Sequence, residues 1–221
     1  MSIDKQITPT PEQLQNLGIL DAEQALKNLE LLSHTFGPGG FSTLSPVILS
    51  TLPASADPDM ALNNLERFVS TLGDVPLFVS LCGERQEILR NFITIFGASR
   101  FLSTFIITIA DECLTRLVDP DYLAHAAGKA ALSRRLARMI DGEPDDKSFY
   151  RAMRVFRKQE MLRIGLRDLL GKADLQETVT ELSDLAEVCL QRAYEWADAG
   201  LAKRYGRPVI RHADGTSTAA G

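Results

Sequence analysis

Hydrophobic residues recur every three or four positions along most of the chain, which is the spacing of one face of an α-helix. The pattern is clearest after Asp57, where the apolar residues are Ala61, Leu62, Leu65, Phe68, Val69 and Leu72. Gly73 follows this series, and glycine commonly terminates helices. A second series between Glu84 and Phe96 ends at Gly97 in the same way. The pattern predicts amphipathic helices in both segments.

Signals for helix starts are spread along the same part of the sequence. In each, a side chain can accept hydrogen bonds from the free amides of a first turn, and most are followed by proline, which fits where no donor is needed. They are Thr10-Pro11, Asp21, Ser45-Pro46, Asp57-Pro58 and Asp119-Pro120. We therefore expect short helices to follow one another between residues 10 and 118.

Two internal segments allow a second interpretation. Phe105–Ile109 is rich in β-branched residues and has the local propensity of a strand. We interpret it as helix, because it continues an apolar series of helical spacing and no other segment offers a partner strand. The glycine-rich stretch Phe36–Gly40 matches neither a P-loop nor a dinucleotide-binding motif. We expect it to form a turn between helices.

Longer helices are predicted over residues 120–205. One runs from about 146 to 170 and is stopped by Gly171, and the next begins at the capping box of Asp174 and extends to Tyr205. Such a pair packs as a long antiparallel hairpin. The apolar residues assigned to the first helix are Val155, Leu162, Leu166 and Leu169. Those assigned to one face of the second are Val179, Leu182, Leu185, Ala186, Cys189, Leu190, Ala193, Trp196 and Ala197.

The predicted fold class is all-α: a multi-helix domain of short helices with a long C-terminal helical hairpin and no sheet. We expect one helical domain over residues 1–208. Residues 209–221 have no apolar period and are expected to form a flexible tail. Within the hairpin, Leu166 and its apolar neighbours should pack on Leu182, Leu185 and Cys189.

Composition narrows the class of protein. The 221 residues carry a net charge of −5 and are 45% hydrophobic, which suits a globular domain with a real core. No apolar run is long enough to span a membrane, and the N-terminal residues do not resemble a secretion signal. We therefore expect a cytoplasmic protein that does not bind a membrane. The three cysteines, Cys82, Cys113 and Cys189, are too far apart for a close-spaced zinc site and read as buried thiols.

Positive charge is concentrated between Lys129 and Lys172, where twelve basic residues accompany six acidic ones. Such a cluster can indicate nucleic-acid binding. The overall acidity, the interleaved Glu160 and Asp168 and the lack of a helix-turn-helix or zinc pattern argue against that partner. A face that pairs with acidic neighbouring helices or with a partner protein fits the sequence better.

The same region resembles a known family. Residues 154–171 read RVFRKQEMLRIGLRDLLG, residues 173–190 read ADLQETVTELSDLAEVCL, and a Tyr-Gly-Arg-Pro sequence follows at 205–208. These segments resemble the bifunctional glutamine synthetase adenylyltransferase/adenylyl-removing enzymes, in the helical region that precedes the first nucleotidyltransferase core. The resemblance implies a role in nitrogen-assimilation control, with ATP and magnesium as cofactors of the full-length enzyme.

The chain departs from the family where the chemistry should begin. The resemblance implies a Gly-Ser-Asp-x-Asp motif that holds magnesium for phosphoryl transfer, and this motif is absent from the sequence. The Asp-x-Asp triplets that begin at Asp57 and Asp119 stand at helix starts and read as caps. His34, His125 and His212 have no ligand partners at suitable spacing. We identify no catalytic, cofactor-binding or metal-binding residue, and predict that this chain alone is inactive.

The remaining candidate site is a charged set on the predicted helix of 146–170. Its members are Arg154, Arg157, Glu160, Arg163, Arg167 and Asp168. They either pair with acidic side chains inside the domain or dock an adjoining nucleotidyltransferase domain, glutamine synthetase or a signalling protein of the P-II type. An independent helical module that binds another protein is the alternative function. The sequence leaves open whether the chain is a fragment or a separate short protein.

Overall fold

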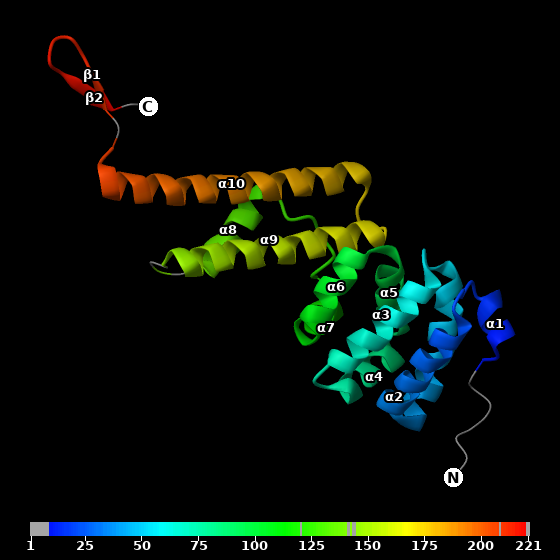
Figure 1. The fold of residues 1–221 in the computed structure, drawn as a ribbon. Helices are drawn as coiled ribbons and strands as arrows, with labels where there is room; N and C mark the ends of the chain where they lie inside the picture. Colours follow the sequence, from blue (N-terminus) through cyan, green and yellow to red (C-terminus); the bar gives the residue numbers. More distant parts are fainter. Residues whose placement is uncertain (1–8, 120, 141, 143–144, 208, 220–221) are drawn as a thin grey trace. The chain divides into compact units, whose positions relative to one another are not determined.

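The computed structural model describes residues 9–219 apart from 120, 141, 143, 144 and 208. Ten α-helices form from these residues, and the all-α class is confirmed (Figure 1). Their bounds are α1 Pro11–Asn16, α2 Ala22–Thr51, α3 Pro58–Thr71, α4 Val75–Glu84, α5 Gln86–Ala98, α6 Arg100–Thr108, α7 Ala110–Val118, α8 Lys129–Met139, α9 Asp146–Leu169 and α10 Leu175–Tyr205. A 3-10 turn covers Leu52–Ala54, and strands β1 and β2 cover Val209–Arg211 and Ser217–Ala219.

Most of the predicted helix starts are confirmed by their hydrogen bonds. The Thr10 hydroxyl accepts from the Gln13 amide at 3.2 Å, and the Gln13 side chain accepts from the Thr10 amide at 2.7 Å, which completes a capping box. Aspartate carboxylates cap the starts of α2, α3 and α10, and each accepts from the backbone amide three positions later. These aspartates are Asp21, Asp57 and Asp174. Phe105 lies within α6, so the helical interpretation of that segment is also confirmed.

Two expected breaks fall inside α2. At Phe36–Gly40 only Gly37 leaves helical geometry, with φ 70° and ψ 171°, so the chain kinks where we expected a turn. A Cβ added to Gly40 would lie 2.9 Å from a methyl of Val79, so this glycine permits α2 and α4 to approach closely. The predicted start at Ser45-Pro46 is wrong, because Pro46 continues α2. Burial of Leu44, Val47 and Ile48 on either side of Pro46 favours the continuous helix.

The segment after α7 also differs from expectation. Asp119 caps the C-terminus of α7 where a helix start was predicted, and Pro120 lies outside the described residues. Residues 121–125 form a turn, and the next helix begins only at Lys129. Leu123 of this turn is buried, and so is Ala127, which lies between the turn and α8.

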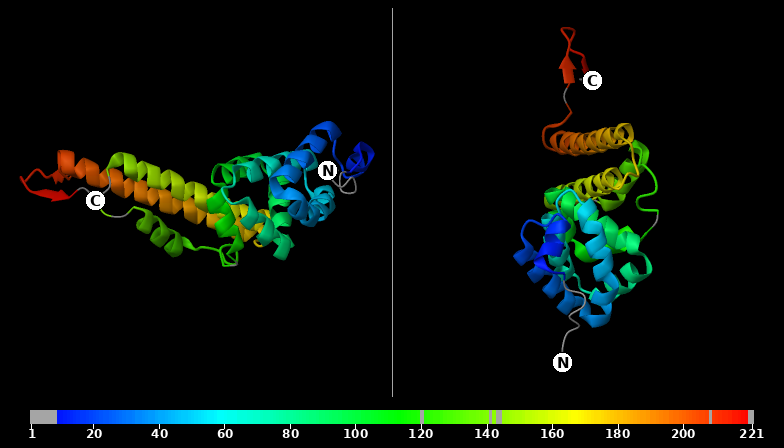
Figure 2. Two further views of the ribbon diagram at one scale, coloured as in Figure 1. Left: turned by 90° about the horizontal axis from the view of Figure 1, so that it is seen from below. Right: turned by 90° about the vertical axis from the view of Figure 1, so that its right-hand side faces the viewer.

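The chain divides into two compact units. The first contains residues 1–126 and 162–178, and its helices from α1 to α7 are coloured blue to green in Figure 2. Its core is built around packed phenylalanine rings. Phe92 lies at the centre of this cluster, with its ring centroid 4.6 Å from that of Phe68 and 5.6 Å from that of Phe96. Leu162 and Leu166 of α9 belong to the same core.

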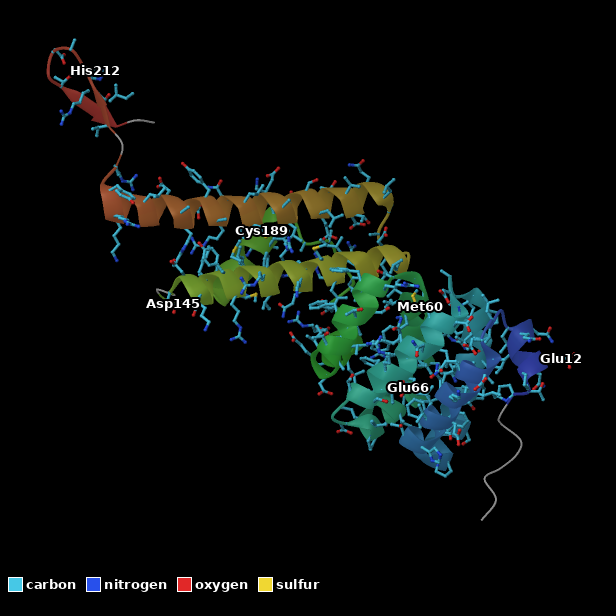
Figure 3. The ribbon with its side chains drawn as sticks, viewed as in Figure 1. Glu12, Met60, Glu66, Asp145, Cys189 and His212 are labelled. Atoms are coloured by element: carbon cyan, nitrogen blue, oxygen red, sulfur yellow. The ribbon has the colours of Figure 1, made fainter. Side chains whose placement is uncertain are left out.

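The second unit contains residues 127–161 and 179–221. Phe149 of α9 stacks on Trp196 of α10, with centroids 4.1 Å apart and ring planes 8° apart, and the Trp196 indole N–H donates to Asp146 at 3.1 Å. Cys189 lies on the side of α10 that faces α9 (Figure 3). The expected single domain over residues 1–208 stays a prediction.

The tail contains more regular structure than expected. Val209–Arg211 pairs antiparallel with Ser217–Ala219, and Gly215 with φ 85° makes the turn possible. This two-stranded hairpin lies beyond the helices and leaves the fold class unchanged. Within the described residues no helix is long and apolar enough to cross a membrane.

Candidate functional site

Two arginines of the predicted charged set lie in the interior of the first unit. Arg163 and Arg167 are 1% and 2% exposed. Both are on the last turns of α9, and each directly follows a core residue, Leu162 or Leu166. A buried guanidinium must find acceptors for its N–H groups, because an unsatisfied buried charge is strongly destabilising.

Arg167 joins two segments that are distant in sequence. Its Nε donates to the Leu123 carbonyl at 3.3 Å, and its Nη2 donates to the Lys172 carbonyl at 3.2 Å and to the Glu177 carboxylate at 2.9 Å. Arg163 donates to the His125 carbonyl at 3.4 Å. These bonds hold the turn after α7 and the turn between α9 and α10 against one helix. The arginines thereby fix the course of the backbone around α9.

Two buried glutamates act in a similar way in the second unit. Glu160 accepts from Arg135 of α8 at 3.0 and 3.1 Å. Glu181 of α10 is 2% exposed and accepts from the backbone amide of Ala127 at 2.6 Å. Two carboxylates farther along α10 bind the start of α8: Asp184 accepts from the Lys129 amide at 3.0 Å, and Glu187 accepts from the Lys129 ammonium. Carboxylates at the N-terminus of α8 also suit its helix dipole.

The other members of the predicted set are exposed. Asp168 accepts from the Thr178 hydroxyl at 3.3 Å, next to the start of α10. Arg154 and Arg157 lie exposed on α9 in the second unit. The set therefore separates into three buried residues that bind their own chain and three exposed ones. A docking role for the set stays a prediction.

Sequence reasoning identified the buried faces of the long helices only in part: Leu162 and Leu166 of α9 and Leu185 of α10 are buried as predicted. The buried positions of α10 are Thr178, Glu181, Leu185 and Val188, spaced by three, four and three. The predicted face included Val179, Leu182 and Leu190, which are exposed. Hydrophobicity misdirected the prediction, because two of the four buried side chains are polar. On α9, Leu162 and Leu166 enter the core of the first unit, and Gly165 lets this surface approach Leu102, which a Cβ would meet at 3.1 Å.

The thiols show no sign of activation. Burial raises the pKa of Cys82 and of Cys113 to about 12 each. Burial also raises the pKa of Cys189, and the nearby Arg157 opposes this shift. No three His, Cys, Asp or Glu side chains of the described residues cluster closely enough to hold a metal ion.

The two Asp-x-Asp triplets use carboxylates to bind backbone amides. Asp57 caps α3, and both oxygens of Asp59 accept from the amides of Leu20 and Asp21, at 2.8 and 3.0 Å. Asp119 accepts from the Asp121 amide at 3.0 Å. Asp57, Asp59 and Asp119 thus each bind at least one backbone N–H group, and Asp57 is a helix cap as the sequence predicted.

Comparison with known proteins identifies the family. The sequence profile described as glutamate-ammonia ligase adenylyltransferase matches residues 89–219, which include α9, α10 and the buried arginines. The chain belongs to this family. The resemblance read from residues 154–208 is thereby confirmed.

Several curated members of the family align with about three quarters of the chain, and all three described here are named bifunctional glutamine synthetase adenylyltransferase/adenylyl-removing enzyme. The protein of Thioalkalivibrio sulfidiphilus is 29% identical over 171 residues, which are 76% of this chain and 16% of the relative. That of Rhodopseudomonas palustris strain BisB5 is 24% identical over 167 residues, covering 76% and 17%. That of Mesorhizobium japonicum is 29% identical over 164 residues, covering 74% and 16%. The chain thus spans about a sixth of the length of these relatives.

Proposed function

We propose that this chain is a non-catalytic helical domain of an enzyme that adenylylates and deadenylylates glutamine synthetase. In this role it supports an adjoining nucleotidyltransferase domain, which supplies the chemistry. The observation that supports the proposal is that Arg163 and Arg167 donate hydrogen bonds inside their own chain. These two residues belong to the segment that resembles the family, and both are buried against backbone carbonyls of their own chain. Charged groups placed in this way determine the position of helices.

A supporting domain has to present its surfaces in fixed positions, and the buried polar contacts are suited to this. Arg167 ties the α9–α10 turn to the turn that follows α7, and Glu181 ties α10 to the start of α8. Each contact joins segments whose register would otherwise depend on non-directional apolar packing. ATP and magnesium would then be held by the adjoining domain, since this sequence lacks the Gly-Ser-Asp-x-Asp motif.

The exposed arginines provide a second, weaker part of the proposal. Arg154 and Arg157 lie on the exposed surface of α9, where a guanidinium can pair with a carboxylate of another protein. We propose that they contact an acidic surface of glutamine synthetase or of a P-II type protein. Nucleic acid is not the expected partner, because the whole chain is acidic.

A replacement experiment tests the proposal. The segment of the Thioalkalivibrio sulfidiphilus enzyme that matches this chain is exchanged for the chain itself, and removal of AMP from adenylylated glutamine synthetase is measured. We expect the exchanged enzyme to be active and an enzyme lacking the segment to be inactive. If the exchanged enzyme is as inactive as the deletion, the chain serves another partner, as the alternative of an independent helical module requires.

A further inference from the structure

One side of α10 carries large apolar side chains that its own chain leaves exposed. We call this set the α10 stripe, and its members are Val179, Leu182, Leu190, Tyr194, Leu201 and Tyr205. Leu190 is 71% exposed, Tyr194 67% and Tyr205 70%. Their spacings of three, four, seven and eight keep these residues near one face of the helix. An apolar stripe of this length is uncommon on a free surface and indicates an interaction site.

The stripe is not needed to hold the second unit together. Contacts with α9, with α8 and with Ala127 just before α8 use other positions of α10, namely Trp196, Asp184 and Glu181. Leu185 and Val188, which are buried, also lie outside the stripe. Four small residues lie among the stripe's large ones and are exposed as well: Ala186, Ala193, Ala197 and Gly200. Small residues leave room for another backbone or side chain to approach the helix closely.

The terminal hairpin that follows α10 in the chain also exposes apolar side chains. Val209 and Ile210 of β1 are 56% and 51% exposed, and β1 pairs only with β2 in the two-stranded sheet of the described residues. A two-stranded hairpin is only marginally stable alone in water, and its edge offers unpaired backbone groups. The stripe and the hairpin therefore both lack a covering layer.

We propose that the α10 stripe and β1 dock the adjoining nucleotidyltransferase domain, through an apolar surface of that domain that includes a sheet edge. The inference rests on the proposed function and specifies where the two domains meet. Its occupant is argued from two exposed elements, the helix face and the open strand pair, which follow one another in the chain. It is argued also from the family, whose members extend well beyond the matched segment. A membrane is a poor occupant, because α10 carries six acidic residues and three basic ones, whereas helices that bind anionic lipid are rich in Lys and Arg.

Radical footprinting of tyrosine side chains tests this docking surface. Tyr194 and Tyr205 report on the stripe, and Tyr150 of α9, which is 51% exposed and outside the stripe, is the matched control. Labelling rates are compared between the 221-residue chain and the exchanged Thioalkalivibrio sulfidiphilus enzyme described above. We expect labelling of Tyr194 and Tyr205 to fall about tenfold in the exchanged enzyme, and labelling of Tyr150 to change less than twofold.

Two results would overturn the inference. In the first, both stripe tyrosines stay as reactive in the exchanged enzyme as in the chain alone. In the second, they become protected in the chain alone as its concentration rises, which would assign the stripe to a second copy. An active exchanged enzyme with unprotected tyrosines removes this inference and keeps the proposed function. An inactive exchanged enzyme with protected tyrosines contradicts the proposed function and keeps this inference.

Discussion

Replacing Arg167 with methionine should destabilise the domain far more than any other arginine change on α9 except one at Arg163. Methionine keeps most of the apolar stem, so the change removes the guanidinium and leaves little cavity. The charged group donates at 2.9 Å to Glu177 and at 3.2 and 3.3 Å to the carbonyls of Lys172 and Leu123. These acceptors lose their donor in the variant.

The loss in the free energy of unfolding depends on whether water can replace the donor at each of those acceptors. The Glu177 side chain is 37% exposed, so water can replace the guanidinium donor and the loss of this hydrogen bond costs little. The two carbonyls face a nearly fully buried side chain, and each unsatisfied buried group costs about 1–3 kcal/mol. Removing one partner of a buried charged network typically costs about 3–5 kcal/mol. We expect about 3 kcal/mol for Arg167→Met, which corresponds to a fall in Tm of roughly 6–12 °C for a chain of this size.

Urea unfolding followed by far-ultraviolet circular dichroism measures this cost. The matched control is Arg154→Met, an exposed position on the same helix that should change the free energy of unfolding by less than about 0.5 kcal/mol. If Arg167→Met costs less than about 1 kcal/mol, or no more than the control, then the buried arginine does not hold the turns and our reasoning on its role is wrong.

Three further predictions concern the cores and the thiols. Phe92→Ala should cost about 3–5 kcal/mol in urea unfolding, because it removes the central ring of the aromatic cluster, and a loss below about 1.5 kcal/mol would contradict this packing. Cys82 and Cys113 should resist a thiol reagent at pH 8. Rapid labelling at pH 8 would contradict their burial. Because the folded pKa of about 12 lies above the unfolded value, the thiols should contribute fully to the free energy of unfolding below about pH 9, and this contribution should decrease between pH 9 and 12. Asp146→Ala should shift the emission of Trp196, the single tryptophan, by removing its indole hydrogen bond, and unchanged emission would argue against that contact.

Local signals predicted most helix boundaries, because they depend on residues close in sequence. Asp174 and Gly171, which has φ 63°, fix the ends of α10 and α9 through backbone geometry alone. The buried face of α10 could not be found in this way. Glu181 occupies it because its carboxylate meets the amide of Ala127, which is 54 positions earlier in the chain. No periodicity of apolar residues encodes a partner at that distance.

The sequence predicted which charged residues of α9 form the set. It did not predict which of them are buried and which are exposed. The spacing of Arg163 and Arg167 placed them on one face, but their burial depends on carbonyls of the turn after α7, where we expected a helix start. The terminal hairpin had a usable signal. Asp214-Gly215 between short runs that include Val209 and Ile210 is a typical hairpin turn, and the low hydrophobicity of the tail obscured it.

The central claim is that this chain supports catalysis without performing it. The most direct measurement incubates adenylylated glutamine synthetase with phosphate and magnesium, and with either the purified 221-residue chain or the exchanged Thioalkalivibrio sulfidiphilus enzyme. Loss of AMP from the synthetase is then followed. We predict no loss above the blank with the chain alone and clear loss with the exchanged enzyme. Loss of the AMP group with the chain alone, and formation of ADP from that group and phosphate, would contradict the claim.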